Sequence, residues 1–180
     1  MAIIKLYHGT IYDFDVIDVN RGKPWKDFGC GFYASRTELQ ARRLAIRNRS
    51  FENALLVENG VKPDAQAWVY TFEFDDDNLA KLNVKEFTEP NEEWVRFVVK
   101  NRSSRKRRHD YDIVIGPTAN DDTNVVVQAF MNRIYGDTNS DKAIQTFLDN
   151  ILPERLPYQV FFGTQRAADL LRRVGRRTVR

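Results

Sequence analysis

The chain has 180 residues, of which 42% are hydrophobic and 29% are charged, so we expect a single globular domain. It contains no apolar run long enough for a transmembrane helix, and its first residues, MAIIKLYHGT, lack the features of a secretory signal. The one cysteine, Cys30, excludes an internal disulfide framework and favours a reducing compartment, so we expect a cytoplasmic protein without a membrane partner.

Basic residues are concentrated in two places, although the net charge is only +3. Lys100–Arg108 contains six basic residues and no acid, and Arg166–Arg180 contains six arginines and one aspartate. The simplest interpretation is a solvated loop, with His109 exposed beside it, and a frayed basic tail of about residues 172–180. The alternative is a surface for nucleic acid or for an acidic protein.

The first half of the chain alternates between strand and helix patterns. IIKLYHG (3–9) reads as a strand, and Ser35 with Glu38 has the spacing of a capping box. That box would open a helix over 36–49, with core contacts from Leu39, Leu44 and Ala45. QAWVYTFEF (66–74) has the period of a strand and places its large aromatic residues on one face: Trp68, Tyr70, Phe72 and Phe74.

The second half continues this mixture without a regular strand–helix–strand rhythm. Helices are expected over 91–102, 123–136 and 140–152, the first with Trp94, Phe97 and Val98 in the core. Short strands are expected over 111–116 and 158–163. Thr164 would cap a last helix over 165–174, which Gly175 would end. With no repeat or linker, residues 1–180 are expected to form one α+β domain.

The sequence contains none of the common catalytic or metal-binding motifs, so no metal site is expected. Two short segments are nevertheless candidates for a functional site. His8 ends the first strand and is followed by Gly9 and Thr10, so it could present its ring to a ligand, or it could be a core histidine bonded to a backbone carbonyl. In DFGCGFYAS (27–35), glycines could let the backbone approach a ligand while aromatic residues form its walls. The alternative for this loop is a tight turn packed by aromatics.

These segments carry a resemblance to a known superfamily. LYHGT (6–10) and DFGCGFYAS resemble the His-Gly-Ser/Thr strand and the Phe-Gly-x-Gly-x-Tyr segment of poly(ADP-ribose) polymerases and diphtheria-toxin-type ADP-ribosyltransferases. YQVFFGTQRAADLL (158–171) resembles their last motif, and all three segments occur in the family order. Nearly the whole chain also resembles a family of small uncharacterised bacterial proteins of that superfamily, through LYHGT, DFGxGFY, EWxxFVxxNR and YDIVIGPTAND.

The resemblance implies a fold and a set of residue roles. Two parts of a split β-sheet with flanking helices would form a cleft for extended NAD. His8 would bond the nicotinamide-side ribose, the backbone of Gly9 would hold the carboxamide, and Thr10 would support the adenine side or the strand end. Tyr33 would stack on the nicotinamide ring. The remaining cleft residues would come from the same loop: Phe28, Gly29, Gly31 and Phe32.

The third catalytic position departs from the usual pattern, because Gln159 stands where many relatives have glutamate. Glutamine forms hydrogen bonds but has no charge and cannot act as a general base. Chain elongation is therefore not expected, whereas transfer of a single unit is. Glu93 could supply the missing acid, or it could be a solvated residue in the first turn of its helix.

The resemblance thus predicts an NAD-dependent mono-ADP-ribosyltransferase that modifies a protein or a nucleic acid, with NAD as substrate. By analogy it predicts a bacterial toxin or effector with a small neutralising partner protein. Two alternatives stay open. One is an NAD glycohydrolase, and the other is a non-catalytic module that binds NAD or nucleic acid on the same fold.

Overall fold

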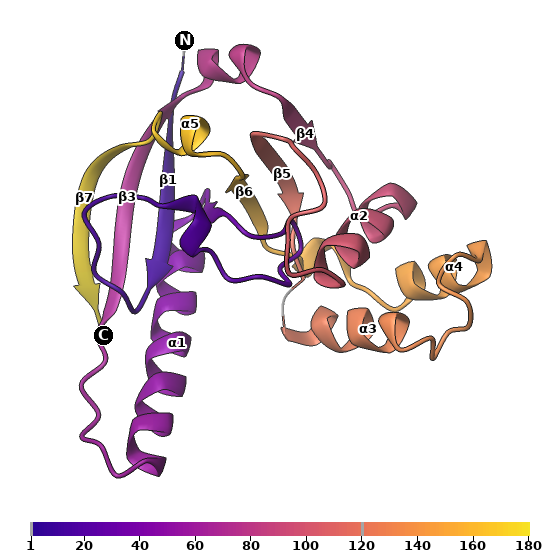
Figure 1. The fold of residues 1–180 in the computed structure, drawn as a ribbon, viewed down its shortest axis with the longest axis horizontal. Coiled ribbons are helices and arrows are strands. Elements are labelled where there is room, and N and C mark those ends of the chain that lie inside the picture. The colour runs from indigo at the N-terminus through magenta and orange to yellow at the C-terminus, as the bar shows by residue number, and fades with distance from the viewer. Residues whose placement is uncertain (1, 120) are drawn as a thin grey trace.

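The structure is a computed structural model that describes residues 2–119 and 121–180, with the side chains of residues 121 and 122 outside that description. Seven strands form one mixed sheet in the order β4-β5-β6-β2-β1-β3-β7 (Figure 1). Only β4 and β5 are parallel. The strands are β1 (Ile3–Thr10), β2 (Phe32–Ser35), β3 (Ala67–Asp75), β4 (Val84–Glu86), β5 (Ile113–Pro117), β6 (Tyr158–Phe162) and β7 (Arg172–Val179).

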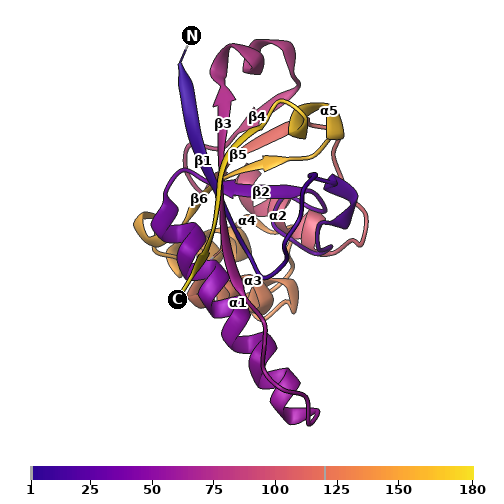
Figure 2. The same ribbon diagram turned by 90° about the vertical axis from the view of Figure 1, so that its left-hand side faces the viewer.

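Helices cover the two ends of the sheet. The long α1 (Glu38–Glu58) lies along β1 and β3, and its C-terminal half runs beyond the sheet (Figures 1 and 2). At the other end lie α2 (Glu92–Arg102), α3 (Asp121–Met131) and α4 (Asp141–Asp149). The short α5 (Gln165–Ala168) follows β6, and short 3₁₀ helices span Val19–Arg21, Asp76–Lys81 and Pro153–Arg155.

Strand alternation divides the core into separate clusters. Tyr70, Phe72 and Phe74 point to one face with residues of the other strands, which confirms the predicted aromatic face of the strand over 66–74. On the other face, Trp94 and Val98 of α2 pack with α3, α4, β5 and β6, which confirms their predicted place in the core, and Phe97 is partly buried against the same cluster. The opposite end of that face is filled by Ala41 and Ala45 of α1 with short side chains of β3 and β7.

The predicted frayed tail is wrong, and the predicted last helix begins where expected but is too long. The C-terminal segment forms β7, which pairs along β3 from Ala67–Val179 to Glu73–Arg172, and α5 ends after four residues at Ala168. Gly175 lies within β7 opposite Thr71 rather than at a helix end. The Thr164 side chain makes no cap bond but donates to a carboxylate oxygen of Asp112 (2.6 Å).

The predicted capping box before α1 is also wrong. Ser35 is the last residue of β2, and its hydroxyl donates to the carbonyl oxygens of Thr37 (2.8 Å) and Tyr7 (3.3 Å). Thr37 is the N-cap residue and makes no side-chain bond there. Leu39 is 54% exposed, whereas Ala45 is fully buried, so the buried stripe of α1 consists of alanines that allow the helix to approach the sheet closely.

The two halves of the sheet meet at a narrow junction between β1 and β2. β1 pairs with β3 over eight residues but with β2 only through Tyr7 and Ser35. β2 then pairs with β6 from Phe32–Phe162 to Ser35–Gln159. The two parts of the expected split sheet are therefore joined in one sheet, in which β1 and β2 diverge after a single pair.

Candidate functional site

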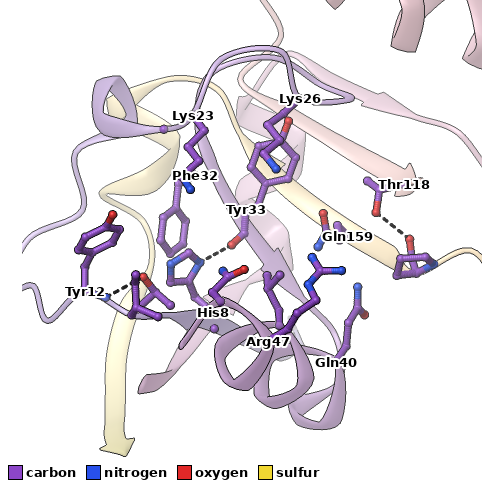
Figure 3. Close-up of a pocket in the computed structure, with 18 of the residues that line it drawn as sticks. His8, Tyr12, Lys23, Lys26, Phe32, Tyr33, Gln40, Arg47, Thr118 and Gln159 are labelled. Atoms are coloured by element: carbon purple, nitrogen blue, oxygen red, sulfur yellow. Dashed lines mark hydrogen bonds between the residues drawn. The ribbon is translucent and has the colours of Figure 1, made fainter. Parts of the chain in front are cut away.

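A cleft of about 1500 Å³ opens where β1 and β2 diverge. It is lined by the end of β1, the loop that follows it, the segment before β2, the exposed side of α1 and the start of β6 (Figure 3). Alternation along the paired strands puts His8 and Phe32 on one face of the sheet and Tyr33 and Gln159 on the other. Because the sheet is open at this point, residues of both faces line one cleft.

Most of the residues singled out from the sequence line this cleft: His8, Gly9, Thr10, Gly31, Phe32, Tyr33 and Gln159. Phe28 and Gly29 do not. Phe28 is fully buried, with ring contacts to core aromatics such as Phe87 and Phe161. The structure therefore brings His8 and Gln159 together across 151 positions of the chain, but it places Phe28 in the core instead of the cleft wall.

His8 is held in one orientation by its surroundings. Its Nδ1 lies 2.7 Å from the carbonyl oxygen of Tyr33, and its ring packs against Phe32 at a centroid distance of 4.4 Å (Figure 3). Since a carbonyl oxygen only accepts, Nδ1 carries the proton and Nε2 is the acceptor nitrogen of the neutral ring. Burial lowers the pKa of His8 to about 4, against a weaker opposing effect of the Tyr33 carbonyl. His8 thus makes the carbonyl bond of a core histidine and lines the cleft as well.

We expect this neutral histidine to make the fold sensitive to acid. Its pKa lies below the unfolded value of 6.5, so the unfolded chain binds more protons as the pH falls from 6.5 to about 4. Stability should fall by on the order of 2–3 kcal/mol across that window from His8 alone. The free energy of unfolding in urea, measured across this window for the wild type and for His8→Gln, checks this. The His8→Gln profile should be shallower, and identical slopes would contradict the assignment.

The loop that contains Gly29 and Gly31 is held by hydrogen bonds to the side chain of Tyr33. The hydroxyl of Tyr33 donates to the carbonyl of Gly29 (2.8 Å) and accepts from the N–H of Phe28 (3.0 Å). Burial, followed by the charge of Asp27, raises the pKa of Tyr33, so the phenol stays neutral. Gly29 has φ +88°, which favours glycine. The loop is therefore the packed turn that the sequence allowed as an alternative, and its end still reaches the cleft.

Gln159 and Gln40 supply uncharged polar groups at the floor of the cleft (Figure 3). Both also line a small adjoining cavity of about 10 Å³ beside Gly9 and Ser35. The side-chain Nε2 of Gln40 is buried and, within the described residues, is the one buried side-chain nitrogen or oxygen without a hydrogen-bond partner. Buried donors are normally satisfied, so an unpaired one beside a cleft indicates room for an acceptor atom from a ligand or water.

Positive side chains form much of the cleft wall, and sequence reasoning did not single them out as a group. The cleft is lined by seven basic and four acidic residues, the basic ones being Arg21, Lys23, Lys26, Arg43, Arg47, Arg102 and Arg155. Partial burial, with contributions from Lys23, Arg102 and Arg47 and opposition from Asp27, lowers the pKa of Lys26. The excess of basic over acidic residues in the lining gives the cleft a positive character that would favour an anionic ligand.

The nearby acids are engaged in bonds of their own. Asp27 is buried and accepts from Arg102 Nε (2.5 Å) and from the N–H of Ala119 (2.6 Å). Asp13 accepts from the hydroxyl of Tyr70 (2.6 Å) and from Arg176 (2.7 Å). Glu93 does not line the cleft but forms an exposed ion pair with Lys85. The expectation that Glu93 completes the site therefore has no support from its position.

Comparison with known proteins gives one assignment. A family model described as "Protein of unknown function (DUF3990)" matches residues 4–172. The chain belongs to the DUF3990 family. No match was found among proteins with curated descriptions. The DUF3990 match begins in β1 and ends at the first residue of β7, so it spans every segment that lines the cleft. None of the helices described for this DUF3990 protein combines the length and apolar character needed to cross a membrane.

Proposed function

We propose that this protein binds NAD in the cleft and transfers its ADP-ribose unit to a macromolecule. The observation that carries the proposal is the meeting of three segments on adjacent strands. The segments that resemble the ADP-ribosyltransferase motifs belong to β1, β2 and β6, and each contributes residues to the same cleft. Segments so far apart in the chain can bind one ligand only if the fold brings them to the same cleft.

The residues of the cleft fit the chemistry of a dinucleotide. NAD has two phosphates, and the cleft receives positive charge from Lys23 and Lys26 of the loop before β2 and from Arg47 of α1 (Figure 3). His8 Nε2 can accept from a ribose hydroxyl, while Gln40 Nε2 is a buried donor without a partner. The side chains of Tyr33 and Phe32 offer aromatic surface for a flat ring.

Transfer would proceed by cleavage of the bond between the ribose and nicotinamide. The electron pair of that bond leaves with nicotinamide, which becomes neutral, and the ribose carbon develops oxocarbenium character. A nucleophilic oxygen or nitrogen of the acceptor then forms the new bond, and its proton passes to water. Gln159 would orient a ribose hydroxyl without adding charge, so positioning and the fixed dipoles of the cleft would lower the barrier.

The mouth of the cleft favours a macromolecular acceptor over water. Five of the large apolar side chains that line the cleft are exposed to solvent: Tyr12, Val16, Leu39, Phe51 and Leu55. A site that hydrolyses NAD gains nothing from exposed apolar side chains at its rim, whereas a protein or nucleic acid can bury them. This rim could equally be covered by a small neutralising protein, which would then compete with the acceptor.

The test is to incubate the protein with NAD labelled on its adenylate part in a cell lysate, beside His8→Ala. We expect release of nicotinamide together with labelled macromolecules, both lost in the variant. Protease and nuclease treatment would then identify the acceptor class. Release of nicotinamide without a labelled macromolecule would indicate that the protein hydrolyses NAD and does not transfer ADP-ribose. Binding of NAD without turnover would indicate a non-catalytic module, in which Gln159 no longer supports chemistry.

Replacing Gln40 with methionine should have opposite effects on stability and on NAD binding. The substitution removes an unpaired buried donor, so the free energy of unfolding should stay unchanged or rise by about 1 kcal/mol. Affinity for NAD should fall by roughly tenfold if the ligand accepts from Gln40. Thermal unfolding and calorimetric titration measure the two quantities. A variant that loses stability, or that binds NAD as the wild type does, would contradict this role.

A further inference from the structure

The two basic stretches of the sequence behave differently in the structure. Four arginines of the C-terminal stretch lie in β7, and each forms an ion pair with an acid on another segment. The pairs are Arg172 with Glu73, Arg173 with Asp15, Arg176 with Asp13 and Arg177 with Glu38. The charge of this strand is therefore largely balanced within the protein, and it leaves little to attract an anionic partner.

The stretch Lys100–Arg108 is not balanced in this way. The exposed side chains of Lys100, Arg105, Lys106 and Arg108 form no ion pair with any other side chain that the structure describes. The same holds for Lys23, which is also exposed. Unpaired cations on the surface keep their full attraction for a polyanion, because no neighbouring carboxylate competes.

This stretch lies beside the loop that precedes β2. Arg102 pairs with Asp27, and Nε2 of His109 lies 2.8 Å from the carbonyl oxygen of Phe28, so His109 is half-buried and not exposed as expected. A Cβ added at Gly29 would lie 3.0 Å from Cγ of Arg107. These contacts join two segments that are about 80 positions apart in the chain. The exposed basic residues of the two segments, together with Trp25, are here called the basic face: Arg21, Lys23, Trp25, Lys26, Lys100, Arg105, Lys106 and Arg108.

Trp25 adds an exposed aromatic ring to the basic face. It is 56% exposed, has φ 56° and lies between Lys23 and Lys26 in the chain. No ring–ring contact ties its indole to another ring within the described residues. A bulky residue in the left-handed region is uncommon, and an exposed tryptophan between cations is typical of surfaces on which bases stack.

We propose that the basic face binds single-stranded nucleic acid. Unpaired cations would contact the phosphates, and the ring of Trp25 would stack on a base, which an acidic peptide could not offer. Arg21, Lys23 and Lys26 belong to the basic face and also line the cleft, so a bound strand would lie at its mouth. If the proposed function holds, the bound nucleic acid is also the acceptor of ADP-ribose, and this part of the inference rests on that function. Binding itself requires no NAD.

The test uses the full chain and short fluorescent oligo-dT and oligo-U, without NAD, at several salt concentrations. Binding should weaken steeply with salt. The double variant Arg105→Ala with Lys106→Ala should reduce the slope of log K against log salt by about 1.4, the value for two phosphate contacts to a single strand. Trp25→Ala should weaken binding about tenfold, and Trp25→Phe should restore most of it. Lys5→Ala with Lys142→Ala removes the same charge from other exposed positions and should change little.

Several results would overturn this inference. They are no binding at low salt, equal losses in the control double variant, and binding that neither the arginine–lysine pair nor Trp25 affects. Equal competition by polyglutamate would assign the basic face to an acidic protein. Oligonucleotide binding without NAD turnover would refute the proposed function alone, whereas NAD turnover without oligonucleotide binding would refute this inference alone.

Discussion

Substitution of His8 by alanine is expected to lower the rate of nicotinamide release from NAD by about 100-fold or more. The reason is that the Nδ1–H bond to the Tyr33 carbonyl fixes the ring so that Nε2 is a preorganised acceptor in the cleft. Loss of the imidazole removes this acceptor and releases the Tyr33 carbonyl to water. Initial rates at saturating NAD, with the thermal stability of the same sample, measure the effect.

His109 offers a matched control for that experiment. It too is half-buried, bonds a backbone carbonyl through its ring and has a pKa lowered chiefly by burial, but it does not line the cleft. His109→Ala should therefore lose stability as His8→Ala does while keeping most of its turnover. Equal loss of turnover in the two variants would mean that the effect of His8 is structural, and it would remove the main argument for its role.

Substitution of Gly9 by alanine is expected to destabilise the fold by about 3 kcal/mol. A Cβ at Gly9 would lie 1.9 Å from the carbonyl oxygen of Ala41, so α1 would have to move away from β1. The helix is one wall of the cleft, and ligand binding should weaken together with stability. Urea unfolding followed by circular dichroism gives the free-energy change.

Gly175 provides the comparison for Gly9, because it also lies in a strand of the same sheet. Its added Cβ would come no closer than 3.4 Å to Thr71, which is ordinary contact. Gly175→Ala should change the free energy of unfolding by less than about 1 kcal/mol. If Gly9→Ala were as mild as Gly175→Ala, the close packing of α1 on β1 would be contradicted.

The α+β class and most internal elements could be predicted from sequence because their signals are local. The alternating aromatics of β3 and the helical spacing of Trp94 and Val98 need only periodicity to be recognised. The meeting of His8, Tyr33 and Gln159 at one cleft needed more than periodicity, since it depends on the strand order β6-β2-β1. Only the order of the motifs in the resembling family pointed to it.

Other features could not be predicted because tertiary contacts decide them. The residues of β7 read as a basic helix and tail, but pairing with β3 and ion pairs with distant acids make them a strand. Phe28 looked like a wall of the cleft because it neighbours the glycines, yet the turn at Gly29 directs it into the core. The basic face was hidden for the same reason, since its two segments are joined by contacts such as Asp27–Arg102 and Phe28–His109 that only the folded chain makes.

The most direct test of the NAD cleft is a titration of the isotope-labelled protein with NAD, followed by the shifts of its backbone amide NMR signals. We expect shifts concentrated in three separate segments, at His8–Thr10, Gly31–Tyr33 and around Gln159, with a further change at the side-chain amide of Gln40. The exposed edge of β7 should stay unaffected. Absence of shifts at millimolar NAD, or shifts confined to residues outside the cleft, would contradict the account.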